Sequence, residues 1–238
     1  MGISIAVASG KGGVGKSTIA ANLAIALSKF KVSTVVVDGN VEGASLGLIM
    51  GIKSYPASIH EVLSGKRSLN DALVDMGGIK VVVGEVAIES LKDIDFDVFE
   101  KAVEELSKKY EVVMVDCPPG LGKDAVTALS ACEQVILVVT PDISAISEAL
   151  KTIMVAKKVG CIILGVVINK TGSKYDIPKE RISDILDIEV IGEIREDEAV
   201  KKALFEGKPL VLHNPNSQLA MELTNVAARL VGRLYPYK

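Results

Sequence analysis

A glycine-rich segment with two lysines lies near the start of the chain and could bind phosphate. It reads G-K-G-G-V-G-K-S, follows an apolar run and precedes a helical pattern. Glycines at this spacing let backbone N–H groups point inward at phosphate oxygens, and a helix start adds partial positive charge. The pattern matches G-x-x-x-x-G-K-[ST], a loop for nucleotide phosphates. The predicted nucleotide-binding residues here are Gly10, Lys11, Gly12, Gly13, Val14, Gly15, Lys16, Ser17 and Thr18.

The last residues of this segment carry groups suited to different parts of a nucleoside triphosphate. Lys16 is expected to bridge the β- and γ-phosphates, and the Ser17 hydroxyl is expected to ligate Mg²⁺. The Thr18 hydroxyl is expected near the α-phosphate. The segment therefore predicts a nucleoside di- or triphosphate, together with Mg²⁺.

Short apolar runs rich in Val and Ile alternate with helical patterns along the chain. Runs without polar alternation indicate strands buried on both faces. The order predicts an α/β fold: a doubly wound, mainly parallel sheet flanked by helices in three layers, with ligands at the carboxyl ends of the strands. The predicted strands are Ile3–Ala8, Val32–Val37, Ile79–Val83, Val112–Val115, Val135–Val139 and Ile162–Ile168. The predicted helices are Ser17–Phe30, Asp97–Lys109, Ser144–Val159, Pro178–Leu186, Asp197–Gly207 and Ser217–Leu234.

The composition narrows the class of protein. The chain has 238 residues, 49 % of them hydrophobic, and no low-complexity linker, so we expect a single domain over residues 1–238. A net charge of -3 disfavours nucleic acid as a partner. With no basic leader and no apolar run long enough to span a bilayer, a cytoplasmic location is expected. The three cysteines Cys117, Cys132 and Cys161 are odd in number, widely spaced and lie in or next to apolar runs, so free thiols are expected. The absence of any CxxC motif, with only two histidines, disfavours a structural metal.

The two histidines and a glycine-rich stretch can each be explained by structure as well as by function. The two histidines are given no catalytic role: His60 lies in a short helix that Ser58 could cap, and His213 lies in a predicted loop. The stretch Gly39–Tyr55 is rich in glycine and follows the second predicted strand. It is interpreted as a mobile ligand loop, with a plain connection as the alternative.

The run from Lys11 to Thr18 resembles the deviant Walker A box of the MinD/ParA family of P-loop ATPases. In that family, a lysine at the position of Lys11 reaches across an ATP-bound dimer to the partner's phosphates. The resemblance implies a homodimer with ATP and a role in trans for Lys11. It extends along nearly the whole chain and is greatest to the archaeal and bacterial MinD-like cell-division ATPases.

The same resemblance assigns residues at the ends of two predicted strands. Val115 to Gly120, at the end of the fourth predicted strand, is similar to the family's Walker B and switch II segment. This implies that Asp116 holds Mg²⁺ through water and that Gly120 offers a backbone N–H near the γ-phosphate. Asp38 matches a family carboxylate expected near Mg²⁺. The implied metal set is therefore Ser17, Asp38 and Asp116.

The adenine base is expected beyond the later strands. Asn169, at the end of a predicted strand, resembles the family's asparagine that pairs with the purine's exocyclic amine and ring nitrogen. A role as a plain strand-end cap is the alternative. The run Arg195, Glu196 and Asp197 resembles the loop that covers the other face of the base. Family members often carry proline where Arg195 stands, which leaves backbone contacts at this position open.

Position 40 departs from the family. Family members usually show Asp-x-Asp here, and this chain has Asp38, Gly39 and Asn40. The implied catalytic residues are Lys11, Lys16, Asp38 and Asn40. An amide can hold water but cannot act as a general base, so we predict ATP binding with hydrolysis slowed by about 10²- to 10⁴-fold. A natural asparagine and one introduced to trap the ATP state fit the sequence equally.

The final predicted helix also differs from MinD proteins, which carry a short amphipathic membrane-binding helix at the C-terminus. Its apolar positions fit packing on the core and leave no basic, hydrophobic segment over. Membrane association is therefore expected to be weak or absent in this chain, with peripheral attachment through a partner as the alternative.

Several functions stay open within this resemblance. The favoured one is a MinD-like ATPase that positions or recruits an unidentified regulatory or cargo protein. A ParA-like DNA partition ATPase would need a basic surface, against which the acidic composition argues. A metallocluster maturation ATPase similar to the Mrp and NifH proteins would need paired cysteines. An ATP-dependent ligase or kinase would need a second-substrate pocket.

Overall fold

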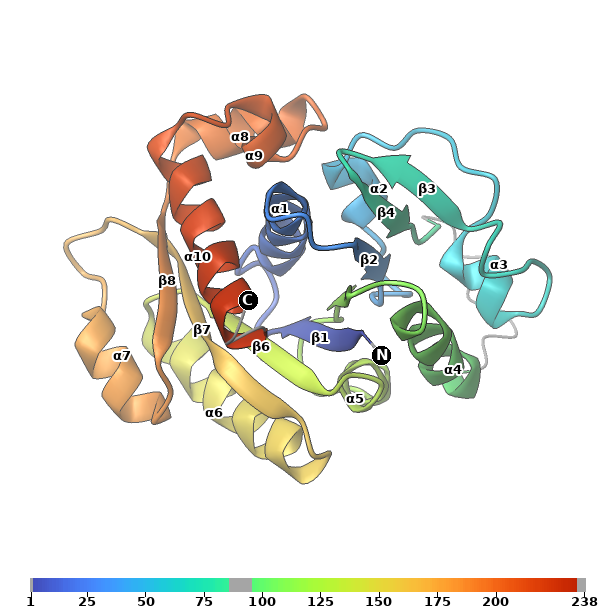
Figure 1. Ribbon diagram of the computed structural model, residues 1–238. Helices are drawn as coiled ribbons and strands as arrows, with labels where there is room; N and C mark the ends of the chain where they lie inside the picture. The colour runs from blue at the N-terminus through green and yellow to red at the C-terminus, as the bar shows by residue number, and fades with distance from the viewer. Residues whose placement is uncertain (1, 86–95, 235–238) are drawn as a thin grey trace.

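An eight-stranded sheet forms the centre of the molecule (Figure 1). The computed structural model describes residues 2–85 and 96–234. The strands lie in the order β3-β4-β2-β5-β1-β6-β7-β8, and all neighbours are parallel except β3 and β4. The mainly parallel, doubly wound sheet that the sequence predicts is therefore confirmed. The strands are β1 Ile3–Ala8, β2 Thr34–Asp38, β3 Leu73–Met76, β4 Ile79–Val82, β5 Val112–Asp116, β6 Gln134–Val139, β7 Ile162–Thr171 and β8 Val190–Arg195.

Helices cover both faces of the sheet (Figure 1). Strand residues alternate between two apolar clusters: Val36 and Met114 face the α1 side, and Val35 and Val113 face the α4 side. This alternation explains why the strands lack polar positions, because both faces are buried. The helices are α1 Lys16–Lys29, α2 Leu46–Ile49, α3 Ile59–Leu63, α4 Phe96–Ser107, α5 Lys123–Ser130, α6 Ile143–Lys158, α7 Lys179–Leu186, α8 Glu198–Phe205, α9 Leu210–His213 and α10 Gln218–Leu234.

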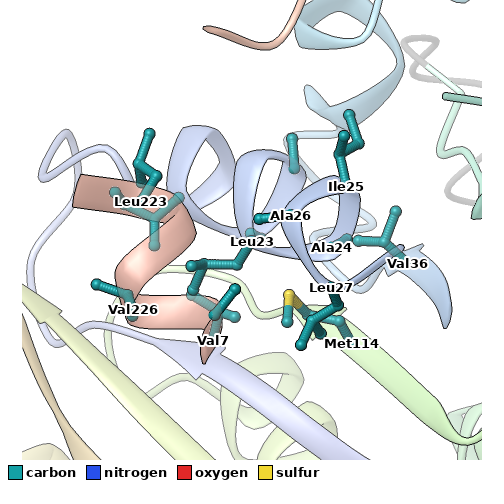
Figure 2. Close-up of a cluster of buried hydrophobic side chains, with 14 of the residues drawn as sticks. Val7, Leu23, Ala24, Ile25, Ala26, Leu27, Val36, Met114, Leu223 and Val226 are labelled. Atoms are coloured by element: carbon teal, nitrogen blue, oxygen red, sulfur yellow. The ribbon is translucent and has the colours of Figure 1, made fainter. Parts of the chain in front are cut away.

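Helix α1 packs on one face of the sheet, beside α10 (Figure 2). Leu23 and Leu27 of α1 are fully buried in the cluster that includes Leu223 and Val226 of α10. The prediction that the final helix packs on the core is confirmed. Because burial of each large apolar side chain contributes about 1.5–3 kcal/mol, this packing fixes the start of α1, where the phosphate segment ends.

The structure differs from the predicted elements in several places. The sequence prediction missed β3, β8, α2 and α5. Because β3 precedes Asp116 in the chain, Asp116 ends the fifth strand and not the fourth. Gly77 and Gly78, with φ of 61° and 87°, make the tight turn between β3 and β4. Positive φ at both residues is typical of a type I′ hairpin, a signal the prediction overlooked. The loop prediction around His213 was wrong, because the backbone forms the short helix α9 after Pro209.

Among the residues that the structure describes, no helix combines the length and the apolar character needed to cross a membrane.

Candidate functional site

The glycine-rich segment forms a loop between β1 and α1. Gly13 and Gly15 adopt φ of 77° and 90°, which glycine tolerates and which let the loop close over the helix start. Lys16 is the first residue of α1. The loop borders a cavity of about 290 Å³ lined by Ser9, Lys11, Gly12, Gly13, Val14, Gly15, Lys16, Ser17, Thr18, Asn40, Ser45, Ile49 and Pro119.

Gly10 contributes to this loop from behind. It does not line the cavity, and a Cβ at Gly10 would lie 2.4 Å from the backbone oxygen of Glu148 in α6. Position 10 therefore requires glycine because the loop packs closely on α6. The cavity is also lined by Ser45 and Ile49, from the predicted Gly39–Tyr55 ligand loop, and by Pro119, from the Val115–Gly120 segment; none of the three was named as a nucleotide-binding residue.

Lys16 and Asp116 form a buried ion pair beside the cavity. Their Nζ and Oδ1 atoms are 3.2 Å apart, and the side chains are 7 % and 0 % exposed. Burial raises the pKa of Asp116, an effect opposed by the Lys16 charge and the Ser17 hydroxyl. The second carboxylate oxygen, Oδ2, is buried without a hydrogen-bond partner. A buried acceptor of this kind favours an additional cation or donor.

Asp38 lies next to Asp116 because β2 and β5 pair in register there. Its carboxylate accepts hydrogen bonds from the backbone N–H groups of Asn40 (3.2 Å), Ser45 (3.1 Å) and Leu46 (3.0 Å). Burial and the nearby Asp116 raise the pKa of Asp38 to about 7, despite these donors. The start of the Gly39–Tyr55 stretch is thus fastened to Asp38.

The donor set suits a hard cation such as Mg²⁺. Two carboxylates and the Ser17 hydroxyl supply oxygen ligands, and Mg²⁺ takes few protein oxygens together with phosphate and water. The unpartnered Oδ2 of Asp116 is an observation that fits this chemistry. Within residues 2–85 and 96–234 there is no group of three or more His, Cys, Asp or Glu side chains that could hold a metal ion. Oxygens from outside the protein would therefore have to complete the coordination.

Asp38 makes the stability of the nucleotide-free protein depend on pH. The folded state retains a proton on Asp38 up to about pH 7, whereas the unfolded chain releases it near the ordinary aspartate pKa of 3.8. The stabilisation is therefore fully present below about pH 4 and is lost as pH rises through about 7, by about 4 kcal/mol. In urea unfolding across this range, Asp38→Asn should show a flatter pH dependence than the unmodified chain. Equal slopes would contradict the assignment.

A second cavity, of about 210 Å³, opens on the other side of α1. It is lined by Gly15, Thr18, Ile19, Asn22, Asn169, Lys170, Ile194, Arg195, Glu196, Asp197, Val200, Lys201, Leu204, Leu210 and Leu223. All four base-site residues predicted from the resemblance lie here: Asn169, Arg195, Glu196 and Asp197. Its apolar lining and polar rim suit a flat heterocycle.

Asn169 also holds the phosphate loop. Its Nδ2 donates to the Val14 carbonyl at 2.7 Å, which leaves one N–H and the Oδ1 of this amide for other partners. Lys170, which the sequence analysis missed, donates from Nζ to the Gly13 carbonyl at 2.8 Å and adopts φ of 60°. This left-handed backbone is costly for lysine and is retained where the surroundings enforce it. The end of β7 therefore clamps the loop.

Gly15 is placed too close to this clamp to accept a side chain. A Cβ would lie 2.3 Å from Asn169 Nδ2, and φ is 90°. Gly15→Ala should therefore weaken ADP binding by about 10- to 100-fold, since such strain costs about 1–3 kcal/mol. Gly160→Ala is the matched control, because Gly160 has φ of 87° and nothing within 4 Å of its Cβ. Calorimetric titration with ADP should show unchanged affinity for the control, and equal losses in both variants would contradict the steric argument.

The remaining predicted residues have partners of their own. Lys11 donates from Nζ to Asp142 Oδ1 at 3.1 Å, with the two side chains 41 % and 45 % exposed. Gly120 has φ of 83°, and its N–H donates to the Ser9 carbonyl at 3.0 Å. Contact of this N–H with a phosphate stays a prediction, and it would require the bond to Ser9 to break. Asp197 caps α8 by accepting from the Ala199 N–H at 2.7 Å.

The cysteines and His60 are structural. Cys117, Cys132 and Cys161 are free and buried, and burial raises the pKa of each thiol. They are therefore poor nucleophiles and poor metal ligands at neutral pH. His60 is 1 % exposed and is fixed by contacts from Nε2 to the Val41 carbonyl and from the Glu85 N–H to Nδ1. The interpretation of His60 as structural is confirmed.

Comparisons with known proteins agree with this architecture. A family model described as ParA: NUBPL iron-transfer P-loop NTPase matches residues 2–231. The chain is 38 % identical to an uncharacterised ATP-binding protein of Methanocaldococcus jannaschii, over 99 % of this chain and 90 % of that protein.

Solved structures give the same result. The septum site-determining protein MinD of Pyrococcus horikoshii, solved with Mg-ADP, has a TM-score of 0.93 and 34 % identity over 97 % of this chain and 96 % of that one. MinD in the MinC:MinD complex of Aquifex aeolicus has a TM-score of 0.87 and 28 % identity, over 97 % and 96 %. Together with the phosphate loop and the strand-end carboxylates, these likenesses show that the chain belongs to the ParA family of P-loop NTPases and is a MinD-like ATPase.

Proposed function

We propose that this chain, as a single ATPase domain over residues 1–238, binds ATP and Mg²⁺ and forms a homodimer around them. The observation that carries the proposal is the exposure of Lys11, the lysine that the phosphate-loop pattern itself does not require. Lys16 is buried against Asp116, whereas Lys11 is 41 % exposed at the cavity rim and pairs with Asp142, which is itself 45 % exposed. A cation that is easily released and lies beside a phosphate site is suited to reach the phosphates of a second copy.

The proposed roles follow from the geometry. Ser17, Asp38 and Asp116 would hold Mg²⁺, and the loop N–H groups and Lys16 would hold the β- and γ-phosphates. The bound metal would neutralise charge on the phosphates. The end of β7 and the Arg195–Asp197 stretch would enclose the adenine, and Asn169 would offer the purine the amide groups that its bond to Val14 leaves unused.

Slow hydrolysis is the proposed consequence of Asn40. Its Nδ2 donates to the Gly43 carbonyl at 2.8 Å, so the side chain stabilises its own turn at the mouth of the cavity. The free Oδ1 could still accept a hydrogen bond from water, but the amide cannot take a proton from it. The ATP-bound dimer would therefore be long-lived.

A long-lived dimer suits the control of another protein. The Aquifex aeolicus MinD structure was solved in complex with MinC, and we propose by analogy that this chain recruits or positions a protein partner when ATP is bound. We place it in the cytoplasm, with any attachment to a membrane made through that partner.

The deciding experiment is the mass of the chain in solution with Mg²⁺ and either ATP or ADP, with phosphate release followed over time. The proposal expects a dimer with ATP, a monomer with ADP and little phosphate released while the dimer persists. A monomer with both nucleotides would remove the role of Lys11 in trans. Rapid phosphate release from a dimer would retain that role and remove the block at Asn40.

A further inference from the structure

The backbone after α2 approaches the backbone after α8, near the top of the view in Figure 1, and each of the two helices carries an exposed large apolar side chain. Phe205, the last residue of α8, is 92 % exposed, and Leu48 of α2 is 66 % exposed. Covering a side chain of this size gains about 1.5–3 kcal/mol, so two of them together can anchor a partner. We call these two residues the Leu48–Phe205 patch.

The backbone between the two side chains is closely packed. Gly51 and Gly207 adopt φ of 68° and 62°, and a Cβ on Gly51 would lie 2.2 Å from the Gly207 carbonyl oxygen. Only glycine at both positions permits this approach. The contact joins two segments far apart in sequence and holds the backbone after α2 against the backbone after α8, which lie next to Leu48 and Phe205.

Each half of the patch borders one of the two cavities of the site. Ile49, next to Leu48, lines the phosphate cavity, and Leu204, next to Phe205, lines the cavity proposed for the base. The residue before α2, Ser45, donates from Oγ to Ser17 Oγ at 3.2 Å. A change of partners at the Ser17 hydroxyl would therefore be transmitted to α2 and so to Leu48.

The charge around the patch is mainly positive. Lys53, Lys202 and Lys208 lie within three residues of Gly51, Phe205 or Gly207, and all three are exposed. None of these lysines has an acidic partner in the part of the chain that the structure describes. The neighbouring acid, Glu206, is engaged with His213 at 3.3 Å. Local positive charge on a chain of net charge -3 indicates an acidic partner.

We propose that the Leu48–Phe205 patch docks an acidic amphipathic helix of a partner protein. The two apolar side chains would contact the apolar face of such a helix, and acidic residues flanking that face would meet the three lysines. Stable attachment to a bilayer takes a larger apolar area than two side chains provide. Only the nucleotide dependence of this docking rests on the function proposed above.

The test is selection from a displayed library of helical peptides on the full chain with Mg²⁺ and a non-hydrolysable ATP analogue. The selected peptides should share an apolar face flanked by Asp and Glu. Fluorescence anisotropy with the best peptide should show affinity lowered at least about tenfold by Phe205→Ser and by Leu48→Ser. Ile162→Ser, at a 62 % exposed isoleucine in β7, is the matched control and should bind as the unmodified chain does.

Further measurements distinguish an acidic helix from other possible binding partners of the patch. Lys202→Glu with Lys208→Glu should weaken the acidic peptide and strengthen its lysine-substituted counterpart. Anionic lipid vesicles bound through Phe205, with no peptide selected, would overturn the proposal in favour of a membrane. Loss of the ATP-dependent dimer in Phe205→Ser would overturn it in favour of a second copy. If no dimer forms in the unmodified chain while peptide binding persists, the proposed function fails and the docking site stands.

Discussion

The Asn40→Asp variant is expected to hydrolyse ATP about 10²- to 10⁴-fold faster than the unmodified chain. The new carboxylate would lie at the mouth of the phosphate cavity, where Asn40 lies now, and could accept a proton from the attacking water. A phosphate-release assay under single-turnover conditions measures the chemical step without product release. The lifetime of the ATP-bound dimer should fall in proportion to the increase in the hydrolysis rate.

The control for this variant removes the side chain without adding a base. Asn40→Ala, like Asn40→Asp, loses the hydrogen bond from Asn40 Nδ2 to the Gly43 carbonyl, because a carboxylate at neutral pH cannot donate. Asn40→Ala should therefore hydrolyse ATP no faster than the unmodified chain. Equal acceleration in both variants would show that the turn held by Asn40, and not the missing carboxylate, limits the rate.

Lys11→Ala is expected to weaken ATP-dependent dimerisation by about 10³-fold or more while leaving ADP affinity within about threefold. Removing one member of a buried charge pair costs about 2–5 kcal/mol, and a symmetric dimer would lose two such pairs. Lys16 and Asp116 are untouched, so the monomer's own phosphate site is preserved. Sedimentation with ATP and titration with ADP give the two readings.

Asp142→Asn distinguishes a role across the dimer from a role within the monomer. It removes the charge that holds Lys11 in the nucleotide-free chain and leaves an Oδ1 acceptor for the Ala145 N–H that starts α6. If Lys11 acts on a second copy, this variant should dimerise with ATP at least as well as the unmodified chain. If Lys11 matters through its bond to Asp142, both variants should lose the dimer alike.

The sequence predicted those parts of the site that depend on the residue types within one short segment. The phosphate loop needs glycines with positive φ between a strand and a helix, and this requirement is visible in Gly13, Gly15 and the residues around them. The buried strands are visible as runs of Val and Ile. Asp38 and Asp116 could be expected close together because each follows such a run, and the carboxyl ends of parallel strands meet on one side of the sheet. Strands β2 and β5 do pair in register there.

The elements that were missed have weak local signals. Strand β3 has four residues, Leu73–Met76, and none is fully buried, so it lacks the apolar run that identified the other strands. Strand β8, Val190–Arg195, lies at the sheet edge, and its apolar residues are interrupted by Gly192 and Glu193, so it lacks an unbroken apolar run. Helix α9 is a single turn, shorter than any periodic pattern can indicate.

The sequence by itself determined the fold class, the phosphate loop and the type of chemistry, because these depend on backbone geometry and burial within short segments. Only the tertiary structure decided which groups meet. Asn169 bonds to Val14 across 155 residues, Lys16 pairs with Asp116 across 100, and Gly51 packs against Gly207. Such contacts follow from the strand order and from how helices pack on the sheet, which bring together residues whose separation in the chain carries no signal.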